Sequence, residues 1–250
     1  WGLKETLSKV EGMFSLALWD RKNRELTLSR DRIGEKPLYY GWQNSTFLFG
    51  SELKALKVHP SFEGKLDRSS IDEYLRFNYV PSPNSIYEGI KKLPPGTFLT
   101  VSLDKKEPNL PIPYWNLLDV VERGQKNTFK GTDSQAVDEL EELLTSVVSQ
   151  QLISDVPLGA FLSGGIDSSL IVAIMQKVST NPVSTFTVAF KEKGFNEAIY
   201  AKEVANYLGT DHKEIQVTSQ DALETIPQMP KLFDEPFSDS SQIPTYLISK

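Results

Sequence analysis

The first half of the chain alternates apolar and polar positions with a period of two, which is typical of half-buried β-strands. Short polar runs separate these segments and predict turns between antiparallel neighbours. A brief helix, capped by Ser69 or Ser70, and one further strand follow. The expected strands cover residues 13–20, 25–30, 38–42, 46–50 and 97–101, and the expected helix covers residues 69–77.

The second half changes to the spacing of amphipathic helices alternating with apolar strands. Such alternation predicts right-handed crossovers and a parallel sheet. Gly209 is placed to end one helix, and Thr218 with Asp221 resembles a capping box at the start of another. The expected helices cover residues 136–152, 168–177 and 196–208, and the expected strands cover residues 157–162, 183–190 and 212–217.

A polar, proline-rich stretch separates the two patterns, and we interpret it as an interdomain connection. Tyr114 and Trp115 lie inside it and are expected to hold it against a domain surface. The predicted organisation is therefore a β-rich domain over residues 1–103, a connection over 104–134 and an α/β domain over 135–250.

Composition narrows the classes of function. Apolar residues make up 39% and charged residues 24% of the chain, which is ordinary for a folded protein. The net charge of −6 gives no support for nucleic-acid binding. With no cysteine in these 250 residues, disulfides, thiolate metal sites and thiol catalysis within them are excluded. Two histidines argue against a histidine metal cluster, and no stretch approaches the roughly 18 apolar residues of a membrane span.

One loop carries the clearest candidate chemistry. Residues 163–169 read Ser-Gly-Gly-Ile-Asp-Ser-Ser and lie between an expected strand and an expected helix, where open α/β sheets bind ligands. Two glycines allow a tight bend that can turn backbone N–H groups toward an anion, and the helix start favours negative charge. The hydroxyls of Ser163, Ser168 and Ser169 can donate to phosphate oxygens.

Asp167 is unexpected beside phosphate unless Mg²⁺ lies between the two, because both supply the hard oxygen ligands that this ion prefers. A structural alternative stays open, since a Gly-Gly turn followed by a serine cap occurs in many α/β proteins. An ordinary P-loop does not fit, because the Gly-Lys-Ser/Thr ending is missing. A charge cluster at Arg30, Asp31, Arg32 and Lys36 is better explained as a solvated turn or an internal salt-bridge network than as catalytic machinery.

The loop resembles the signature of the ATP pyrophosphatases, which cleave ATP between its α and β phosphates. Together with the preceding residues 154–162, it is similar to the glutamine-dependent asparagine synthetase branch. Residues 11–20, 30–40, 51–56 and 93–96 independently resemble the later part of that family's glutaminase domain. Two domains therefore match in the family's order.

The resemblance implies a mixed fold. Its first part would be the C-terminal portion of an Ntn-type glutaminase β-rich sandwich, with mixed α+β character. Its second part would be the first half of an ATP-pyrophosphatase parallel-sheet domain, of the adenine nucleotide alpha hydrolase-like type. The chain begins with Trp1 and stops inside a helical pattern at Lys250, so we expect an internal fragment.

The implied reaction joins ammonia, released from glutamine, to aspartate that ATP has activated as β-aspartyl-AMP, with pyrophosphate leaving. Asp167 would be the metal ligand for Mg²⁺. Near the end of the chain, an acidic segment lies where the family shapes its acceptor pocket. The residues expected to contact ATP are Leu162, Ser163, Gly164, Gly165, Asp167, Ser168, Ser169 and Val188, and those considered for the acceptor are Asp234, Asp239 and Ser240.

Departures from the family pattern limit these expectations. The cysteine nucleophile is missing, and the second synthetase loop would lie beyond Lys250, so we expect no catalytic residue in these 250 residues and no activity from them alone. Expected partners are ATP, aspartate and glutamine-derived ammonia, in a cytoplasmic enzyme, with neither nucleic acid nor membrane. A homodimer is the assembly considered. Two alternatives stay open, namely a related amidating enzyme for another carboxylate and a non-catalytic nucleotide-binding relative.

Overall fold

A computed structural model describes residues 1–102, 110–190 and 197–250. The chain divides into two compact units. Unit 1 contains residues 1–128 and 230–239, and unit 2 contains residues 129–229 and 240–250. The predictions for residues 103–109 and 191–196, including the predicted start of a helix at Asn196, lie outside the described residues.

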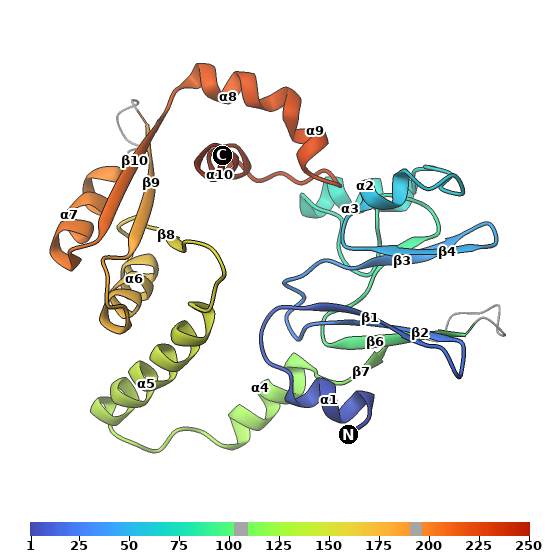
Figure 1. Cartoon of the computed structure of the whole chain (residues 1–250), viewed down its shortest axis with the longest axis horizontal. Coiled ribbons are helices and arrows are strands. Elements are labelled where there is room, and N and C mark those ends of the chain that lie inside the picture. Colours follow the sequence, from blue (N-terminus) through green and yellow to red (C-terminus); the bar gives the residue numbers. More distant parts are fainter. Residues whose placement is uncertain (103–109, 191–196) are drawn as a thin grey trace. The chain divides into compact units, whose positions relative to one another are not determined.

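Unit 1 is built on antiparallel sheets. One described sheet has the strand order β1-β2-β6-β7 and the other has the order β4-β3-β5 (Figure 1). The strands are β1 (Ser15–Asp20), β2 (Glu25–Arg30), β3 (Tyr39–Gln43), β4 (Thr46–Gly50), β5 (Ile90–Lys92), β6 (Thr97–Ser102) and β7 (Ile112–Pro113). The helices are α1 (Leu3–Lys9), α2 (Leu53–Lys57), α3 (Arg68–Phe77) and α4 (Leu117–Lys126).

Two apolar clusters set the layers of unit 1. Because side chains alternate along a strand, Tyr39 and Tyr40 on β3 point to opposite faces. Tyr40 packs with Leu28 of β2 and Leu99 of β6, so this cluster joins the two sheets. Tyr39 packs with Leu53 of α2 and residues of α3, so the second cluster joins the β3 sheet to helices. Unit 1 therefore has three layers, namely the β1-β2-β6-β7 sheet, the β4-β3-β5 sheet, and helices α2 and α3.

Asp31 organises the loop that follows β2. Its side chain is 1% exposed, and its two carboxylate oxygens accept four backbone N–H groups. The donors are Phe14 (3.3 Å), Gly34 (2.6 Å), Glu35 (2.9 Å) and Lys36 (3.0 Å). Burial by itself would raise the pKa of Asp31, but these hydrogen bonds outweigh it, and the pKa lies below its ordinary value.

Arg30 holds the same loop from the other side. Its guanidinium donates to the carbonyl oxygens of Lys36 (2.8 Å), Leu93 (2.9 Å) and Gly34 (2.5 Å). The predicted solvated turn or salt-bridge network is therefore wrong in detail. The charges of Arg30 and Asp31 are satisfied chiefly by backbone groups, because the loop's own N–H and C=O groups need partners once it is buried.

Unit 2 alternates helices with parallel strands. The order of its described sheet is β10-β9-β8, with both pairings parallel (Figure 1). Its strands are β8 (Gly159–Phe161), β9 (Ser184–Phe190) and β10 (Asp211–Val217). Its helices are α5 (Asp133–Gln151), α6 (Ile166–Val178), α7 (Ala198–Leu208), α8 (Ser219–Thr225), the 3₁₀ turn η1 (Ile226–Gln228) and α10 (Gln242–Ser249), while α9 (Met229–Leu232) spans the boundary between the units.

Strand β9 shows why one face of this sheet is available to a ligand. Thr185, Thr187 and Ala189 are buried, while the alternate side chains of the strand are half-exposed. On the helix-covered side, Leu162 packs with Val172 of α6 and Ala201 of α7. The other face of β9 borders a cavity.

Local signals decide several of the described helix ends. Thr132 caps α5 in a full capping box with Gln135, and Thr218 does the same for α8 with Asp221. Gly209 ends α7 with φ of 71°. The predicted cap of α3 is wrong, because Asp67 accepts from the Ser69 N–H at 2.9 Å and the helix begins one residue earlier. No helix within the described residues has the length and apolar character needed to cross a membrane.

Replacing Asp31 with asparagine should lower the free energy of unfolding by about 3 kcal/mol at neutral pH, because an amide cannot accept all four N–H groups. The lowered pKa means that the ionised form stabilises the fold above the unfolded pKa of about 4 and that this contribution is lost at lower pH. The free energies of unfolding of the wild type and the variant, measured by urea titration, should therefore become similar at acidic pH.

Asp20→Asn is the matched control, because Asp20 also accepts backbone N–H groups, from Lys22 and Asn23, but in an exposed turn. Asp20→Asn should lower the free energy of unfolding clearly less than Asp31→Asn does. Equal losses for the two variants would contradict the organising role of Asp31.

Candidate functional site

The loop of residues 163–165 joins β8 to α6, and its own hydroxyls hold it in shape. Ser163 Oγ and Ser168 Oγ lie 2.9 Å apart, and Ser168 Oγ accepts from the Ser163 N–H at 3.2 Å. The Gly165 N–H donates to Ser163 Oγ at 3.3 Å. Helix α6 begins directly after Gly165, so its first N–H groups and the loop hydroxyls belong to one local structure.

Gly164 is required where it stands for two reasons. Its φ of 77° is in the left-handed region that favours glycine. A Cβ added there would lie 2.7 Å from the backbone nitrogen of Ala201 and 2.7 Å from Cβ of Tyr200, both on α7. The bend therefore lets the first turn of α7 approach the loop.

A cavity of about 730 Å³ opens beside this loop within unit 2. It lies at the carboxyl ends of β8 and β9, where parallel α/β sheets bind ligands. Its described lining combines apolar side chains with hydroxyls and one carboxylate. The lining residues are Phe161, Leu162, Ser163, Ser168, Phe186, Thr187, Val188, Phe190, Glu197, Val217, Ala222, Ser240, Ser241, Ile243, Pro244, Thr245 and Ile248.

The exposed face of β9 forms one wall of this cavity. Phe186, Val188 and Phe190 alternate along the strand, and all three reach the cavity. Leu162, only 1% exposed, both packs in the core and lines the cavity. An apolar wall of this kind suits the flat faces of a nucleoside, while the loop end is polar.

The structure brings together part of the set expected from sequence. Leu162, Ser163, Ser168, Val188 and Ser240 line the same cavity. Gly164 and Gly165 form the bend, and Asp167 and Ser169 lie in the first turn of α6. The Ser169 hydroxyl is buried without a hydrogen-bond partner among the described residues.

Several lining residues were not expected from sequence, notably Phe186, Phe190 and Glu197. The alternation of β9 offered a signal for the two phenylalanines, since each lies two positions from Val188. Of the α10 residues in the lining, Thr245 and Ile248 were also not expected. They reach the cavity through tertiary packing of α10 against β9, which no local pattern indicates.

Mg²⁺ suits this site only as a companion of a nucleotide. Asp167 is exposed at the start of α6, and no group of three or more acidic or histidine side chains that could hold a metal occurs within the described parts of the chain. Mg²⁺ commonly keeps several waters and is held by one or two carboxylates together with substrate phosphates. The donor set therefore fits a metal that arrives with phosphate.

Asp234, one of the residues considered for an acceptor, lies in unit 1. Its carboxylate accepts from the N–H groups of Leu53 (2.7 Å) and Lys54 (3.1 Å) at the start of α2. The Lys54 ammonium in turn donates to the carbonyl of Leu232 at 2.9 Å. Asp234 therefore has a structural role at the end of a helix.

Glu235 continues this attachment to unit 1. Its carboxylate accepts from the Ile86 N–H at 2.7 Å and pairs with the Lys92 ammonium at 2.5 Å. The side chains of Lys92 and Glu235 are 15% and 10% exposed. Burial, with the Glu235 carboxylate beside the ring hydroxyl, raises the pKa of Tyr39 above its ordinary value. The neighbouring Asp239 belongs to the same segment of unit 1, whereas Ser240 belongs to unit 2.

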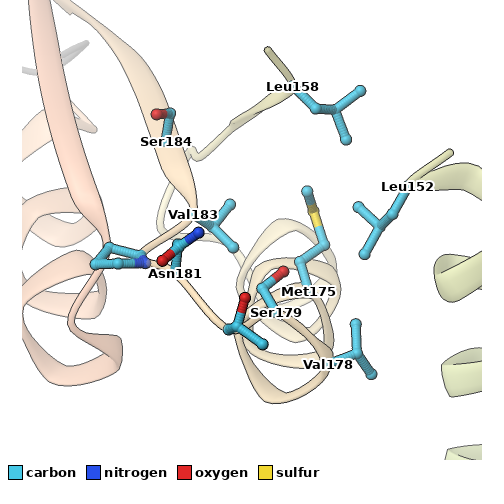
Figure 2. A pocket seen from close by; sticks show the side chains of 10 residues that line it. Leu152, Leu158, Met175, Val178, Ser179, Asn181, Val183 and Ser184 are labelled. Atoms are coloured by element: carbon cyan, nitrogen blue, oxygen red, sulfur yellow. The ribbon is translucent and has the colours of Figure 1, made fainter. Parts of the chain in front are cut away.

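A second cavity of unit 2, of about 400 Å³, lies near the amino-terminal end of β9 (Figure 2). Leu152, Leu158 and Met175 surround it, together with polar residues of the turn before β9. None of its described lining residues is ionisable, and it lies at the opposite end of the strand from residues 163–169. The larger cavity is therefore the better candidate for a charged nucleotide.

Two family profiles match successive parts of the chain. Residues 1–115 match the glutamine amidotransferase domain profile, and residues 139–250 match the asparagine synthase profile.

Relatives match almost the whole chain. The provisionally named glutamine-hydrolyzing asparagine synthetase 2 of Methanocaldococcus jannaschii is 34% identical over 98% of the chain and 47% of its own length. Glutamine-hydrolyzing asparagine synthetase 1 of Bacillus subtilis is 32% identical over 99% of the chain and 37% of its own length. That of Cricetulus griseus is 28% identical over 91% of the chain and 39% of its own length. The chain thus spans about half the length of these relatives or less.

An amidotransferase domain followed by a synthase region with a glycine-bend loop places the chain in the class of two-domain amidotransferase–synthetases. Within that class, the chain belongs to the family of glutamine-hydrolyzing asparagine synthetases. Family members are ATP-dependent.

Gly164→Ala should lower the free energy of unfolding by about 2 kcal/mol, because the new methyl group combines an unfavourable φ with a backbone clash against α7. Gly165→Ala is the control, since Gly165 has φ of −74° and its added Cβ would meet only the Ser163 hydroxyl, at 3.2 Å. Thermal unfolding of both variants checks this. Two equally stable variants would contradict the close approach of α7.

Glu235→Gln should destabilise the chain by about 3 kcal/mol, because it leaves the Lys92 ammonium buried without its counter-charge. Adding Lys92→Met should recover part of this loss, as measured by a double-mutant cycle in urea. The exposed pair Lys65–Glu88, also 2.5 Å apart, is the control, and Glu88→Gln should have a much smaller effect. Similar losses at the two pairs would refute the anchoring role of Glu235.

Proposed function

We propose that the chain provides the nucleotide-binding part of a ligase that converts L-aspartate to L-asparagine. The reaction uses ATP, which becomes AMP and pyrophosphate, and ammonia from glutamine hydrolysis. The observation that carries the proposal is the glycine bend at residues 163–165, which opens on a cavity at the carboxyl ends of parallel strands. Membership of the asparagine synthetase family supports the choice of reaction.

In this proposal the cavity binds ATP along its length. Leu162 and Val188 contact the nucleoside, since both belong to the wall that β8 and β9 supply. Ser163, Gly164 and Gly165, with Ser168 and Ser169, hold the β,γ-pyrophosphate through hydroxyls and backbone N–H groups at the start of α6. The Ser169 hydroxyl has no hydrogen-bond partner among the described residues, so it can serve as a donor for this purpose.

Asp167 would be the residue that holds Mg²⁺ beside the same phosphates. A dication neutralises charge on the departing pyrophosphate, which is what the ion contributes when bound. The carboxylate of Asp167 positions that charge from the first turn of α6, next to the loop that grips the phosphates.

The chemistry proposed for the whole protein has two steps. The β-carboxylate of aspartate attacks the α-phosphorus of ATP, and the bond to the pyrophosphate oxygen breaks. Ammonia then attacks the acyl carbon, AMP leaves with the electron pair of the C–O bond, and a proton is lost to form the amide. The cavity contributes positioning and charge neutralisation, which are the main requirements of such a displacement.

Of the acceptor residues considered, Ser240 is the best placed, because it lines the cavity. Asp234 remains a weaker proposal, since its carboxylate is already engaged by N–H groups of α2. Asp239 lies next to Ser240 in the chain and stays in the proposed set. Substrates are small molecules in this scheme, and the enzyme is cytoplasmic. Neither nucleic acid nor membrane takes part, and a homodimer is retained as the assembly to test.

The finer fold assignment also belongs to the proposal. Residues 1–103 would be part of an Ntn-type glutaminase domain, residues 104–134 the connection and residues 135–250 part of an ATP-pyrophosphatase domain. The sheet-on-sheet packing of unit 1 and the parallel sheet of unit 2 are compatible with these folds. Because these 250 residues contain no cysteine, no cysteine-dependent glutaminase step is proposed for them.

Asp167→Ala in the intact protein should reduce Mg²⁺- and aspartate-dependent pyrophosphate release by at least about a hundredfold without lowering the melting temperature. Asp138→Ala on the exposed face of α5 is the control and should leave the rate unchanged. Normal turnover by the Asp167 variant would show that the metal assignment is wrong.

The acceptor is tested in the same assay with ammonium as the nitrogen source, which separates synthesis from glutamine hydrolysis. Aspartate should be the carboxylate that supports pyrophosphate release and amide formation. Release with a different acid would identify a related amidating enzyme, and release with none of a panel of acids would favour a non-catalytic relative.

A further inference from the structure

Glu197 is the single ionisable side chain among the described residues that line the nucleotide cavity. The other described lining residues are apolar or carry hydroxyl groups. The Glu197 side chain is exposed, and its carboxylate has no hydrogen-bond or ion-pair partner among the residues that the structure describes. A carboxylate without a partner in the described part of the chain, in a cavity for an anionic ligand, requires an explanation.

The backbone fixes Glu197 near the phosphate end of the cavity. Glu197 immediately precedes α7, and its carbonyl oxygen accepts from the Ala201 N–H at 3.1 Å. The same Ala201 nitrogen lies 2.7 Å from the position of a Cβ added to Gly164. Glu197 is therefore held within one helical turn of the point where α7 touches the glycine bend.

The Glu197 carboxylate would repel a phosphate group that binds without a cation. A triphosphate bound at residues 163–169 would place negative charges near the Glu197 carboxylate, and like charges repel. No cationic side chain is found among the described lining residues. A divalent cation between the phosphate and the carboxylate removes the conflict, because Mg²⁺ accepts one or two carboxylates beside phosphate oxygens.

We infer that Glu197 is a second carboxylate for the nucleotide-bound Mg²⁺, approaching from α7 while Asp167 approaches from α6. It binds the ion directly or through one of the ion's waters. The inference rests on the proposed function, because it assumes that the cavity binds ATP. It adds that the site selects the metal complex of the nucleotide over the free nucleotide.

Calorimetric titration of the chain with ATP, in excess Mg²⁺ and separately in EDTA, tests the inference without requiring turnover. Glu197→Gln should weaken binding of Mg-ATP about tenfold, the loss expected for one charge-assisted contact. Binding of metal-free ATP should be unchanged or tighter, because a repulsive charge has been removed. Glu197→Lys should bind metal-free ATP more tightly than the wild-type chain does.

Glu203→Gln makes the same substitution at an exposed position of α7 outside the cavity lining, and it should bind both forms as the wild type does. Unchanged Mg-ATP affinity of Glu197→Gln would overturn the inference. An equal loss for Mg-ATP and metal-free ATP would also overturn it, since a general disturbance of α7 would act on both. If the wild-type chain binds neither form, the proposed function itself fails.

Discussion

The close approach of α7 to the glycine bend is the constraint on which unit 2 depends. The backbone nitrogen of Ala201 occupies the space that any side chain at Gly164 would need. Because Ala201 and Ala205 are also small and fully buried, the helix can pack closely against Leu162, the residue just before the loop, and against Val172 of α6. This packing aligns the start of α6 with the cavity and places Glu197 beside it. The close contact between Gly164 and Ala201 thus determines the shape of the loop and also the positions of Glu197 and the start of α6 beside it.

One buried and one half-buried carboxylate serve a related purpose in unit 1, where they replace water as acceptors for backbone N–H groups. Asp31 closes a loop within the domain, and Asp234 closes the start of α2 from a distant part of the chain. Both are satisfied at their oxygens, which is why burial is tolerated. Acidic residues near the end of such a sequence therefore cannot be assigned to substrate from their charge alone.

Much of the fold could be predicted because local signals agree with tertiary structure. The alternation in residues 25–30 and 46–50 reproduces β2 and β4, and the threonine caps of α5 and α8 form as their sequences suggest. The cap of α3 was misplaced because Asp67 competes successfully with the nearby serines. Of the expected site, Leu162, Ser163, Ser168 and Val188 meet at one cavity. The position of Asp234 depends on N–H groups of α2, far along the chain, and that of Glu197 depends on the approach of α7 to Gly164, so no local pattern could reveal either.

Residues 230–239 lie within the region that matches the asparagine synthase family, yet they pack in the unit that the amidotransferase domain builds. The evolutionary modules and the physical bodies of this protein therefore have different borders. Suppose that two related proteins are recombined with one crossover near residue 128. Lys92 would then come from one parent, and the residue at position 235 would come from the other. A stable chimera must therefore take Lys92 and Glu235 from the same parent, so residues 230–239 restrict which parts of two relatives can be combined.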